Sequence, residues 1–289
     1  MVTWMIDRFG SDNQRQRWAT KLCSMELLGS YCLTEPSAGS DAAALKTRAV
    51  RDGEHYVLNG QKQFISGAGA SDIYVVMVRT GGEGPSGIST LVVPADTPGM
   101  SYGASERKMG WNAQPTRAVI FEDARVPVAN RLGEEGIGFN IAMAGLDGGR
   151  LNIAACSLGG AQAAFDKALA YMRDRKAFGK ALTEFQALQF RLADMATELA
   201  AARLLLYDAA AAYDSGHPET TMRCAMAKCF VTDIGFKVAN EALQLHGGYG
   251  YLSEYGVEKI VRDLRVHQLL EGTNEIMRLI IARKLVSET

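Results

Sequence analysis

The hydrophobic pattern of the chain changes near residue 135, and this change is the strongest constraint on its fold. Before that point, short apolar runs with strand composition alternate with Gly- and Pro-rich turns. After it, long Ala-rich segments repeat their apolar residues at helical spacing. No long helix interrupts the strand runs, which argues against βαβ units. The pattern predicts an α+β chain in which a β-sandwich or barrel precedes a set of helices.

Several segments of the first part have the composition of strands. Asn59-Gly60 is typical of a type I′ hairpin turn and is flanked by two such segments. The spacing of the segments is typical of an antiparallel sandwich or barrel. The predicted strands are residues 55–58, 61–66, 72–79, 88–93 and 118–122.

The second part is predicted to be a four-helix bundle. Leu188, Leu192, Met195 and Leu199 follow i, i+4, i+7, i+11 spacing, which places them on one face of a long helix. Thr183-x-x-Gln186 has the form of a capping box, and Gly247-Gly248 is a helix stop. The predicted helices are residues 138–173, 183–215, 218–245 and 273 to the end.

These signals divide the chain into three predicted regions. Residues 1–29 form an amphipathic helical fragment without a cap and are interpreted as the remainder of an N-terminal helical domain. Residues 30–130 form the middle β domain, and residues 131–289 form the C-terminal four-helix bundle domain.

Composition excludes several classes of function. The 31 Lys and Arg residues against 32 Asp and Glu leave a net charge of −1, which gives no basic surface for nucleic acid. No apolar run approaches the roughly 20 residues that span a bilayer, and the start lacks the pattern of a secretory signal. The five cysteines are scattered, and no histidine has a close partner at ligand spacing, so neither a disulfide framework nor a metal site is expected.

The common motifs for nucleotides and nucleophiles are absent. The nearest match to G-x-G-x-x-G, which starts at Gly67, has Asp72 in place of the third glycine. Neither the phosphate-binding loop of NTPases nor a G-x-S-x-G elbow occurs.

Five polar, glycine-containing segments instead carry a specific resemblance. YCLTEPSAGSD, LDGGR, RKAFG, LHGGYGY and EGTNE occur in that order. Together they resemble the acyl-CoA dehydrogenase family, and the similarity extends over residues 1–289. The resemblance implies a middle β domain and a helical C-terminal domain. It also implies a flavoenzyme that uses FAD to oxidise a short, α-branched, isobutyryl-type acyl-CoA to the 2-enoyl-CoA.

The resemblance extends to partners and location. Electrons would pass to an electron-transfer flavoprotein, and the chain would form a homo-oligomer, a dimer or tetramer, located in the cytoplasm of a bacterium or in a mitochondrial matrix. Two alternatives stay open: an acyl-CoA oxidase that returns electrons to oxygen, and a truncated, non-catalytic chain that binds flavin or a partner.

The resemblance implies that Glu271 is the catalytic base. Leu269 and Leu270 give it an apolar setting, and Gly272 allows a substrate to approach closely. The alternative is a solvated glutamate ahead of a helix that Thr273 caps. In isovaleryl- and long-chain-type relatives the base lies just before the arginine of the LDGGR segment, where this chain has a glycine.

The resemblance also assigns cofactor contacts on two parts of the chain. Around the flavin ring it places Tyr31, Leu33, Thr34, Phe64, Ile65 and Ser66, with Ser40 close by. Toward a neighbouring subunit's FAD it places Arg175, Phe178, Phe185, Gln186, Gln244, Leu245, Gly247 and Gly248, with Thr273 and Glu275 at the other end of the cofactor. Taken singly, these residues also fit turns, strands, a charge run at a helix end, a cap and a helix stop.

For the CoA thioester, the resemblance assigns Ser40, Asp147, Arg150 and Arg283. The alternative for Arg150 is an ion pair with Asp147 at i, i+3 on a helix. His246 and His267 are expected to be packed or capping residues.

Overall fold

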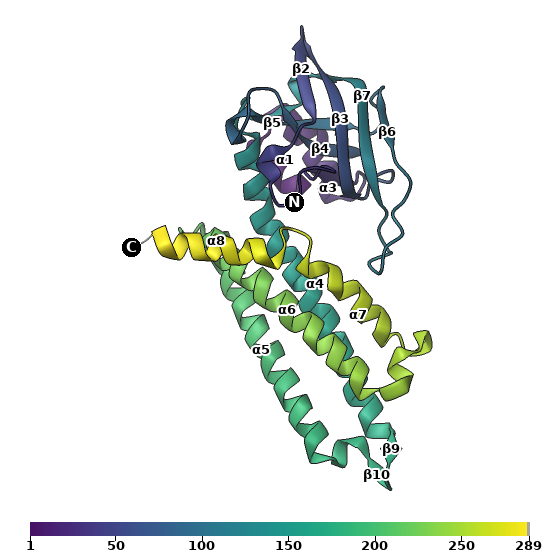
Figure 1. Ribbon diagram of the computed structural model, residues 1–289. Helices are drawn as coiled ribbons and strands as arrows, with labels where there is room; N and C mark the ends of the chain where they lie inside the picture. The colour runs from purple at the N-terminus through teal and green to yellow at the C-terminus, as the bar shows by residue number, and fades with distance from the viewer. Residues whose placement is uncertain (288–289) are drawn as a thin grey trace. The chain divides into compact units, whose positions relative to one another are not determined.

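The computed structural model describes residues 1–287, which form two compact units (Figure 1). The first, here called the β unit, comprises Met1–Arg107 and Ala113–Leu146. The second, here called the helical unit, comprises Lys108–Asn112 and the chain from Asp147 onward.

One mixed sheet forms the centre of the β unit (Figure 1). Its strand order within the described residues is β6-β7-β3-β2-β4-β5-β8, and β1 pairs with β4. Most neighbours are antiparallel, as predicted, but the β1–β4 and β2–β4 pairs are parallel. The strands are β1 (Gly29–Cys32), β2 (Arg48–Asp52), β3 (His55–Ser66), β4 (Ile73–Arg79), β5 (Ile88–Pro94), β6 (Met100–Tyr102), β7 (Thr116–Pro127) and β8 (Arg131–Leu132).

The hairpin predicted at Asn59-Gly60 is wrong. β3 runs through this dipeptide without turning, and its register against β7 shifts between Leu58 and Gly60. The turn instead lies at Gly53, between β2 and β3, where φ is +58°. Gly60 serves close packing, because a Cβ atom there would lie 2.7 Å from the Thr47 Cα. A glycine in a strand thus marks a bulge here and not a chain reversal.

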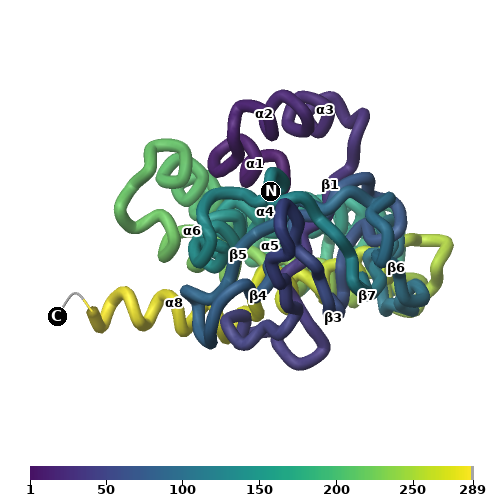
Figure 2. Tube along the Cα trace, turned by 90° about the horizontal axis from the view of Figure 1, so that it is seen from above, coloured from purple at the N-terminus to yellow at the C-terminus, as the bar shows by residue number. Residues whose placement is uncertain are grey.

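The N-terminal segment folds into helical turns that belong to the β unit (Figure 2). Met5, Ile6 and Trp18 are buried in a cluster with Val75 of β4 and Ile141 of α4. The turns are α1 (Val2–Phe9), α2 (Asp12–Gln14), a π-helical turn (Arg15–Ala19) and α3 (Thr20–Cys23).

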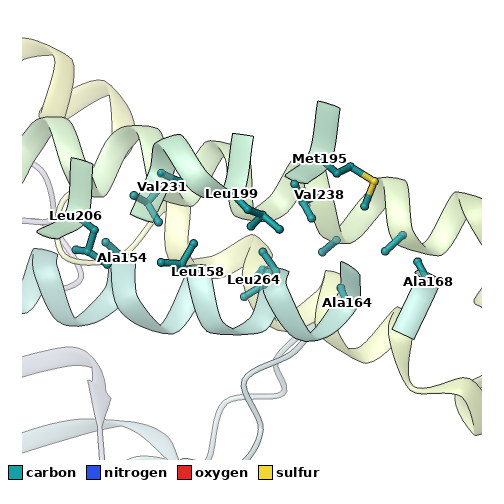
Figure 3. Packing of buried hydrophobic residues seen from close by; sticks show 14 of the residues in the cluster. Ala154, Leu158, Ala164, Ala168, Met195, Leu199, Leu206, Val231, Val238 and Leu264 are labelled. Atoms are coloured by element: carbon teal, nitrogen blue, oxygen red, sulfur yellow. The ribbon is translucent and has the colours of Figure 1, made fainter. Parts of the chain in front are cut away.

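Long helices make up most of the helical unit (Figure 1). They are α4 (Gly138–Asp174), α5 (Gln186–Ser215), α6 (Thr220–Leu245), α7 (Val257–Arg265) and α8 (Asn274–Ser287), with the hairpin β9 (Lys176–Ala177) and β10 (Lys180–Ala181) after α4. Short 3₁₀ turns lie at Ala42–Ala44, Pro85–Gly87, Val128–Asn130, Leu182–Glu184, Gly247–Tyr251, Ser253–Tyr255 and Val266–Gln268. In the core, Leu158, Leu199, Val231 and Leu264 come from α4, α5, α6 and α7 and face one another (Figure 3).

Helix α7 was missing from the prediction. Its apolar residues Val257, Ile260, Val261 and Leu264 have i, i+3, i+4, i+7 spacing and pack in the main core. Helix α8 packs instead in a smaller cluster with α6, through Met277 and its neighbours. The C-terminal half is therefore helical as predicted, and the short α7 supplies the fourth side of the main core.

The predicted capping box at Thr183-x-x-Gln186 is also wrong. Helix α5 begins at Gln186, after Phe185, and has no side-chain cap. The Glu184 carboxylate accepts a hydrogen bond from the Ala181 N–H at 2.7 Å, so this acidic residue closes the preceding 3₁₀ turn. The helix begins later in the chain than the capping motif predicts, because a 3₁₀ turn precedes it.

Candidate functional site

Glu271 lies in the loop between the 3₁₀ turn Val266–Gln268 and α8, in an unusual backbone conformation. Its φ is +57°, and that of Gly272 is +87°. A left-handed conformation disfavours a residue with a Cβ, so the surrounding structure must hold Glu271 in place. Within residues 1–287, its buried Oε2 atom has no hydrogen-bond partner. A buried carboxylate oxygen without a hydrogen-bond partner indicates that the side chain has a function other than stabilising the fold.

Burial dominates the electrostatics of Glu271. Loss of solvation raises the pKa of its carboxyl to about 7, although Arg150 and Lys228 act in the opposite direction. A carboxyl group with a pKa near neutrality exchanges a proton readily at physiological pH.

Arg150 lies on α4 and is almost completely buried. Its Nη1 donates to Asp147 Oδ1 at 2.6 Å, and the Thr221 hydroxyl donates to Asp147 Oδ2 at 2.7 Å. The i, i+3 ion pair considered from the sequence is therefore present. Arg150 Nε is buried and has no partner among the described residues. The guanidinium thus retains a donor that the fold itself does not use.

Lys228 on α6 supports the loop that carries Glu271. Its side chain is fully buried, and Nζ donates to the Gly272 carbonyl at 2.7 Å and to Asn274 Oδ1 at 2.8 Å. Sequence reasoning missed this residue, because a lysine inside an amphipathic helix normally faces solvent.

Expected cofactor residues of the helical unit gather around one pocket of about 530 Å³. Arg175, Gln244, Leu245, Gly247 and Gly248 line it. The end of α4 and the end of α6 bring these residues together. Gly247 has φ +61°, a conformation in which glycine is favoured at the helix end.

An aromatic cluster that sequence reasoning missed lies at the same pocket. Tyr171 stacks on His246 at 4.5 Å between ring centroids, and Tyr249 and Tyr255 lie 5.3 Å apart. The Arg175 guanidinium lies 5.4 Å from the centre of the Tyr249 ring. His246 is buried and bonded to the Ala242 carbonyl at 2.7 Å, which confirms that it is a packed residue. The LHGGYGY motif indicated the tyrosines of that segment, but no sequence pattern indicated their partner Tyr171.

The β9–β10 hairpin presents Phe178 to solvent. Its side chain is 95% exposed, with φ +50°, and its ring lies 6.2 Å from that of Phe185. Gln186, the first residue of α5, is also exposed. An aromatic side chain that the fold holds out in solvent is available for a partner.

In the β unit, the two expected flavin-ring segments lie side by side. The Gln63 N–H donates to the Thr34 carbonyl at 2.8 Å, and the Ser30 hydroxyl donates to the Ser66 carbonyl at 2.6 Å. Strand β3 shifts register between Lys62 and Ile65, and Phe64 within this irregularity has φ +58° and 64% exposure. Ile65 next to it is buried. The bulge thus turns an aromatic ring outward from the sheet.

A buried ion pair joins these segments. Lys62 Nζ donates to Glu35 Oε1 at 2.8 Å and to the Leu33 carbonyl at 3.2 Å. The Thr47 N–H also donates to Glu35. Burial alone would raise the pKa of Glu35, but Lys62 and the N–H donors hold it below its ordinary value. Sequence reasoning missed both ionised residues.

The remaining predicted residues are less enclosed. Ser40 is exposed in the loop before Ala42–Ala44, and Arg283 is exposed on α8. Tyr31, partly buried on β1, donates its hydroxyl to the Ala142 carbonyl at 3.3 Å.

Thr273 accepts a hydrogen bond from the Ile276 N–H at 3.4 Å, as a cap of α8 would. Hydrogen bonds at the start of this helix lower the pKa of Glu275, which is exposed.

Comparison with known proteins identifies the class. The family model described as acyl-CoA dehydrogenase, middle domain, matches residues 30–124, and that described as acyl-CoA dehydrogenase, C-terminal domain, matches residues 136–286. The chain belongs to the acyl-CoA dehydrogenase family and is an oxidoreductase of that family.

Individual relatives are similar along nearly the whole chain. Mitochondrial isobutyryl-CoA dehydrogenase of Bos taurus is 58% identical over 288 residues, which cover 100% of this chain and 69% of that protein. The protein of the same name from Dictyostelium discoideum is 56% identical, covering 99% of this chain and 69% of that protein. The solved structure of butyryl-CoA dehydrogenase from Megasphaera elsdenii is 42% identical with a TM-score of 0.97, covering 98% of this chain and 74% of that chain. The predicted fold class is confirmed.

Members of this family generally bind FAD, and the residues present suit that cofactor. The pocket of the helical unit combines a guanidinium, a carboxamide and a glycine pair beside aromatic rings, a donor set that suits phosphate and adenine. The exposed, backbone-strained Phe64 in the β unit offers a flat apolar face to a ring system.

Proposed function

We propose that this chain catalyses the FAD-dependent α,β-dehydrogenation of a short, branched acyl-CoA, with isobutyryl-CoA as the substrate. The observation that carries the proposal is Glu271, whose buried carboxylate oxygen has no partner in the part of the chain that the structure describes. Burial raises its pKa to about 7, which suits a base that removes the proton α to a thioester carbonyl. The names of relatives 56–58% identical support the choice of acyl group.

The chain's own residues have two tasks in this reaction. Glu271 takes the α-proton on its carboxylate, and the left-handed backbone at Glu271 and Gly272 sets the position of that side chain in the loop before α8. Arg150 stabilises the ionised carboxylate from a buried position, so that burial does not push the pKa beyond the useful range.

FAD, when bound, supplies the electron-deficient ring that accepts a hydride from the β-carbon. In the β unit, Tyr31, Leu33, Thr34, Phe64, Ile65 and Ser66 would hold that ring. In the helical unit, Arg175, Phe178, Phe185, Gln186, Gln244, Leu245, Gly247 and Gly248 would hold the pyrophosphate and adenosine of a neighbouring subunit's FAD, with Thr273 and Glu275 at the other end. Ser40, Asp147, Arg150 and Arg283 would serve the CoA thioester.

This arrangement implies partners. Residues that serve a neighbouring subunit's cofactor require a homo-oligomer, a dimer or tetramer as in the family. We further propose that an electron-transfer flavoprotein receives the electrons and that the pathway served is valine breakdown.

The test is the visible spectrum of the purified chain under anaerobic conditions, before and after addition of isobutyryl-CoA. We expect a yellow protein that bleaches, and Glu271→Gln should keep FAD but slow the bleaching roughly 10²–10⁴-fold. Bleaching of Glu271→Gln at the original rate would reject Glu271 as the base. A protein that stays colourless with added FAD would favour a non-catalytic chain, and stoichiometric peroxide in air would favour an oxidase.

A further inference from the structure

Lys228 is a buried cation with neutral partners. Its side chain has no measurable exposure, and no carboxylate in the described chain lies within ion-pair distance of Nζ. Its acceptors are the Gly272 carbonyl and Asn274 Oδ1, at 2.7 and 2.8 Å. Because an unpaired buried ammonium is costly, such a residue needs a compensating role.

Its backbone acceptor belongs to the turn that carries Glu271. Glu271 and Gly272 both have positive φ, at +57° and +87°. The φ of Gly272 would strain any other residue, and a Cβ atom there would lie 2.7 Å from Met277 Cε, the end of a flexible side chain that would have to move. A hydrogen bond to the Gly272 carbonyl fixes the peptide unit between Gly272 and Thr273, and so restricts the rotation that would release the left-handed turn.

The second acceptor extends this anchor to both sides of the loop. Asn274 Nδ2 donates to Asp233 Oδ1 at 2.7 Å, and Gln268 Nε2 donates to the same oxygen at 2.7 Å. The residues three before and three after Glu271 are thus tied to one carboxylate of α6, which lies five residues after Lys228. The loop is held by a polar network and not by apolar packing alone.

Charged and titratable groups of α4, α6 and the loop before α8 act on Lys228. They are Cys229 and Asp233 on α6, Arg150 on α4, His267 before the loop and Glu271 in it. Burial lowers the pKa of Lys228 to about 8, so it is largely cationic at neutral pH. Burial and the Lys228 charge lower the pKa of His267 to about 4, so that imidazole is neutral there. At neutral pH Arg150 and Lys228 are therefore two of the positive charges that lower the pKa of Glu271.

We propose that Lys228 is a positioning residue for Glu271: it holds the Glu271–Gly272 turn in its left-handed form through the Gly272 carbonyl and keeps a positive charge beside the carboxylate. The role rests on the proposed function, in which Glu271 is the base. Lys228 touches the backbone next to Glu271, and it acts through that residue.

Two variants separate the hydrogen bond from the charge. Lys228→Met removes both, whereas Lys228→Gln retains an amide donor and removes the charge. Lys237→Gln is the matched control, since Lys237 lies on the same helix in an exposed pair with Glu198. The readout is the anaerobic rate of flavin bleaching by saturating isobutyryl-CoA between pH 5.5 and 9, together with the substrate concentration at half-saturation.

We expect Lys228→Met to lower the limiting rate at least 10-fold, with half-saturation changed less than about 2-fold. The midpoint of its acid limb should rise by about one pH unit, because the carboxylate loses a nearby cation. Lys228→Gln should show the same rise with a smaller loss of rate, and Lys237→Gln should match the parent protein. A merely structural lysine would lower the amount of folded, FAD-containing protein without moving the midpoint.

The inference is overturned if folded Lys228→Gln keeps the parent midpoint, whether or not Lys228→Met folds. Glu271→Gln is measured in the same series. If it is inactive while both Lys228 variants behave as the parent, this inference fails and the proposed function stands. If Glu271→Gln bleaches normally, both fail.

Discussion

At the scale of single residues, Glu271 shows how a site can oppose stability. Its backbone is in a region that costs about 1–3 kcal/mol for a residue with a Cβ, and its buried carboxylate oxygen has no partner in residues 1–287. The raised pKa of its carboxyl group, about 7, allows Glu271 to act as a base near neutral pH.

The same shift predicts how stability depends on pH. The folded-state pKa of Glu271 lies above its ordinary value of 4.5, so the folded chain binds more protons between these values and becomes less stable as pH rises through about 7. Glu271→Gln avoids this cost. We expect it to raise the free energy of unfolding by roughly 1–3 kcal/mol at pH 8 and by much less at pH 5. The denaturant midpoints of the parent protein and of Glu271→Gln at both pH values measure this difference in stability. An equal gain in stability at pH 5 and pH 8 would contradict a raised pKa of Glu271.

At the scale of elements, the Glu35–Lys62 pair joins two segments of the β unit. Lys62 points from β3 into the turn that follows β1, and Glu35 also accepts the Thr47 N–H. Both side chains are buried, so neither can turn to water if its partner is lost. The pair therefore sets the spacing between the segment around Thr34 and the bulge at Phe64.

Lys62→Met should destabilise the β unit by about 3–5 kcal/mol, because it leaves the Glu35 charge buried without its cation. Adding Glu35→Gln should recover part of the loss, since an amide oxygen still accepts a backbone N–H. As a control, Arg125→Gln breaks the exposed pair with Asp52 and should cost less than about 1 kcal/mol. Thermal unfolding of the four proteins compares them. Equal losses of stability in Lys62→Met and Arg125→Gln would show that the buried ion pair stabilises the protein no more than the exposed one.

Elements were predictable where one periodicity dominated. The strands at 72–79 and 88–93 and the three long helices agree with the structure to within a few residues. The error at Gly60 arose because glycine marks both turns and bulges, and only the contact with Thr47 separates the two. Helix α7 is nine residues long and follows two 3₁₀ turns, so its apolar stripe was too short to stand out.

Sequence patterns alone predicted less of the candidate site than of the fold. Glu271 was chosen by resemblance, and an apolar flank alone did not distinguish it from a solvated glutamate. Lys228 and Tyr171 become site residues only when helices place them beside partners more than 40 residues away. No local pattern marks such contacts, since both residues lie in the interior of regular helices.

At the scale of the whole molecule, the surface of the helical unit has apolar side chains that a monomer would leave in water. Phe190, Leu204 and Tyr207 on α5 are 59%, 71% and 61% exposed, and Leu279 and Leu285 on α8 are also exposed. With a net charge of −1, the chain has little electrostatic repulsion between copies. In residues 1–287 no helix has the length and hydropathy to span a membrane.

We expect a homo-oligomer in solution, and light scattering after size exclusion measures its mass against 31.2 kDa for one chain. Leu204→Glu should shift the protein toward smaller species, because it places a charge in an apolar contact. Val50→Glu, at an exposed apolar side chain of the β unit, is the control. A monomeric parent protein would contradict the assignment of Arg175 and Gln244 to a neighbouring subunit's cofactor.

The five residues Lys108–Asn112 belong to the helical unit although the chain reaches them between β6 and β7. The Trp111 N–H donates to Asp263, 152 positions later, and the Trp111 and His267 rings lie nearly perpendicular with their centroids 4.6 Å apart. At about 5–20 residues per second, a ribosome needs roughly 8–30 s to deliver that aspartate after the tryptophan. The nascent chain therefore completes the surroundings of His267, four positions before Glu271, as one of its last events, and a gene fragment that starts at Asp147 would encode a helical unit without its tryptophan.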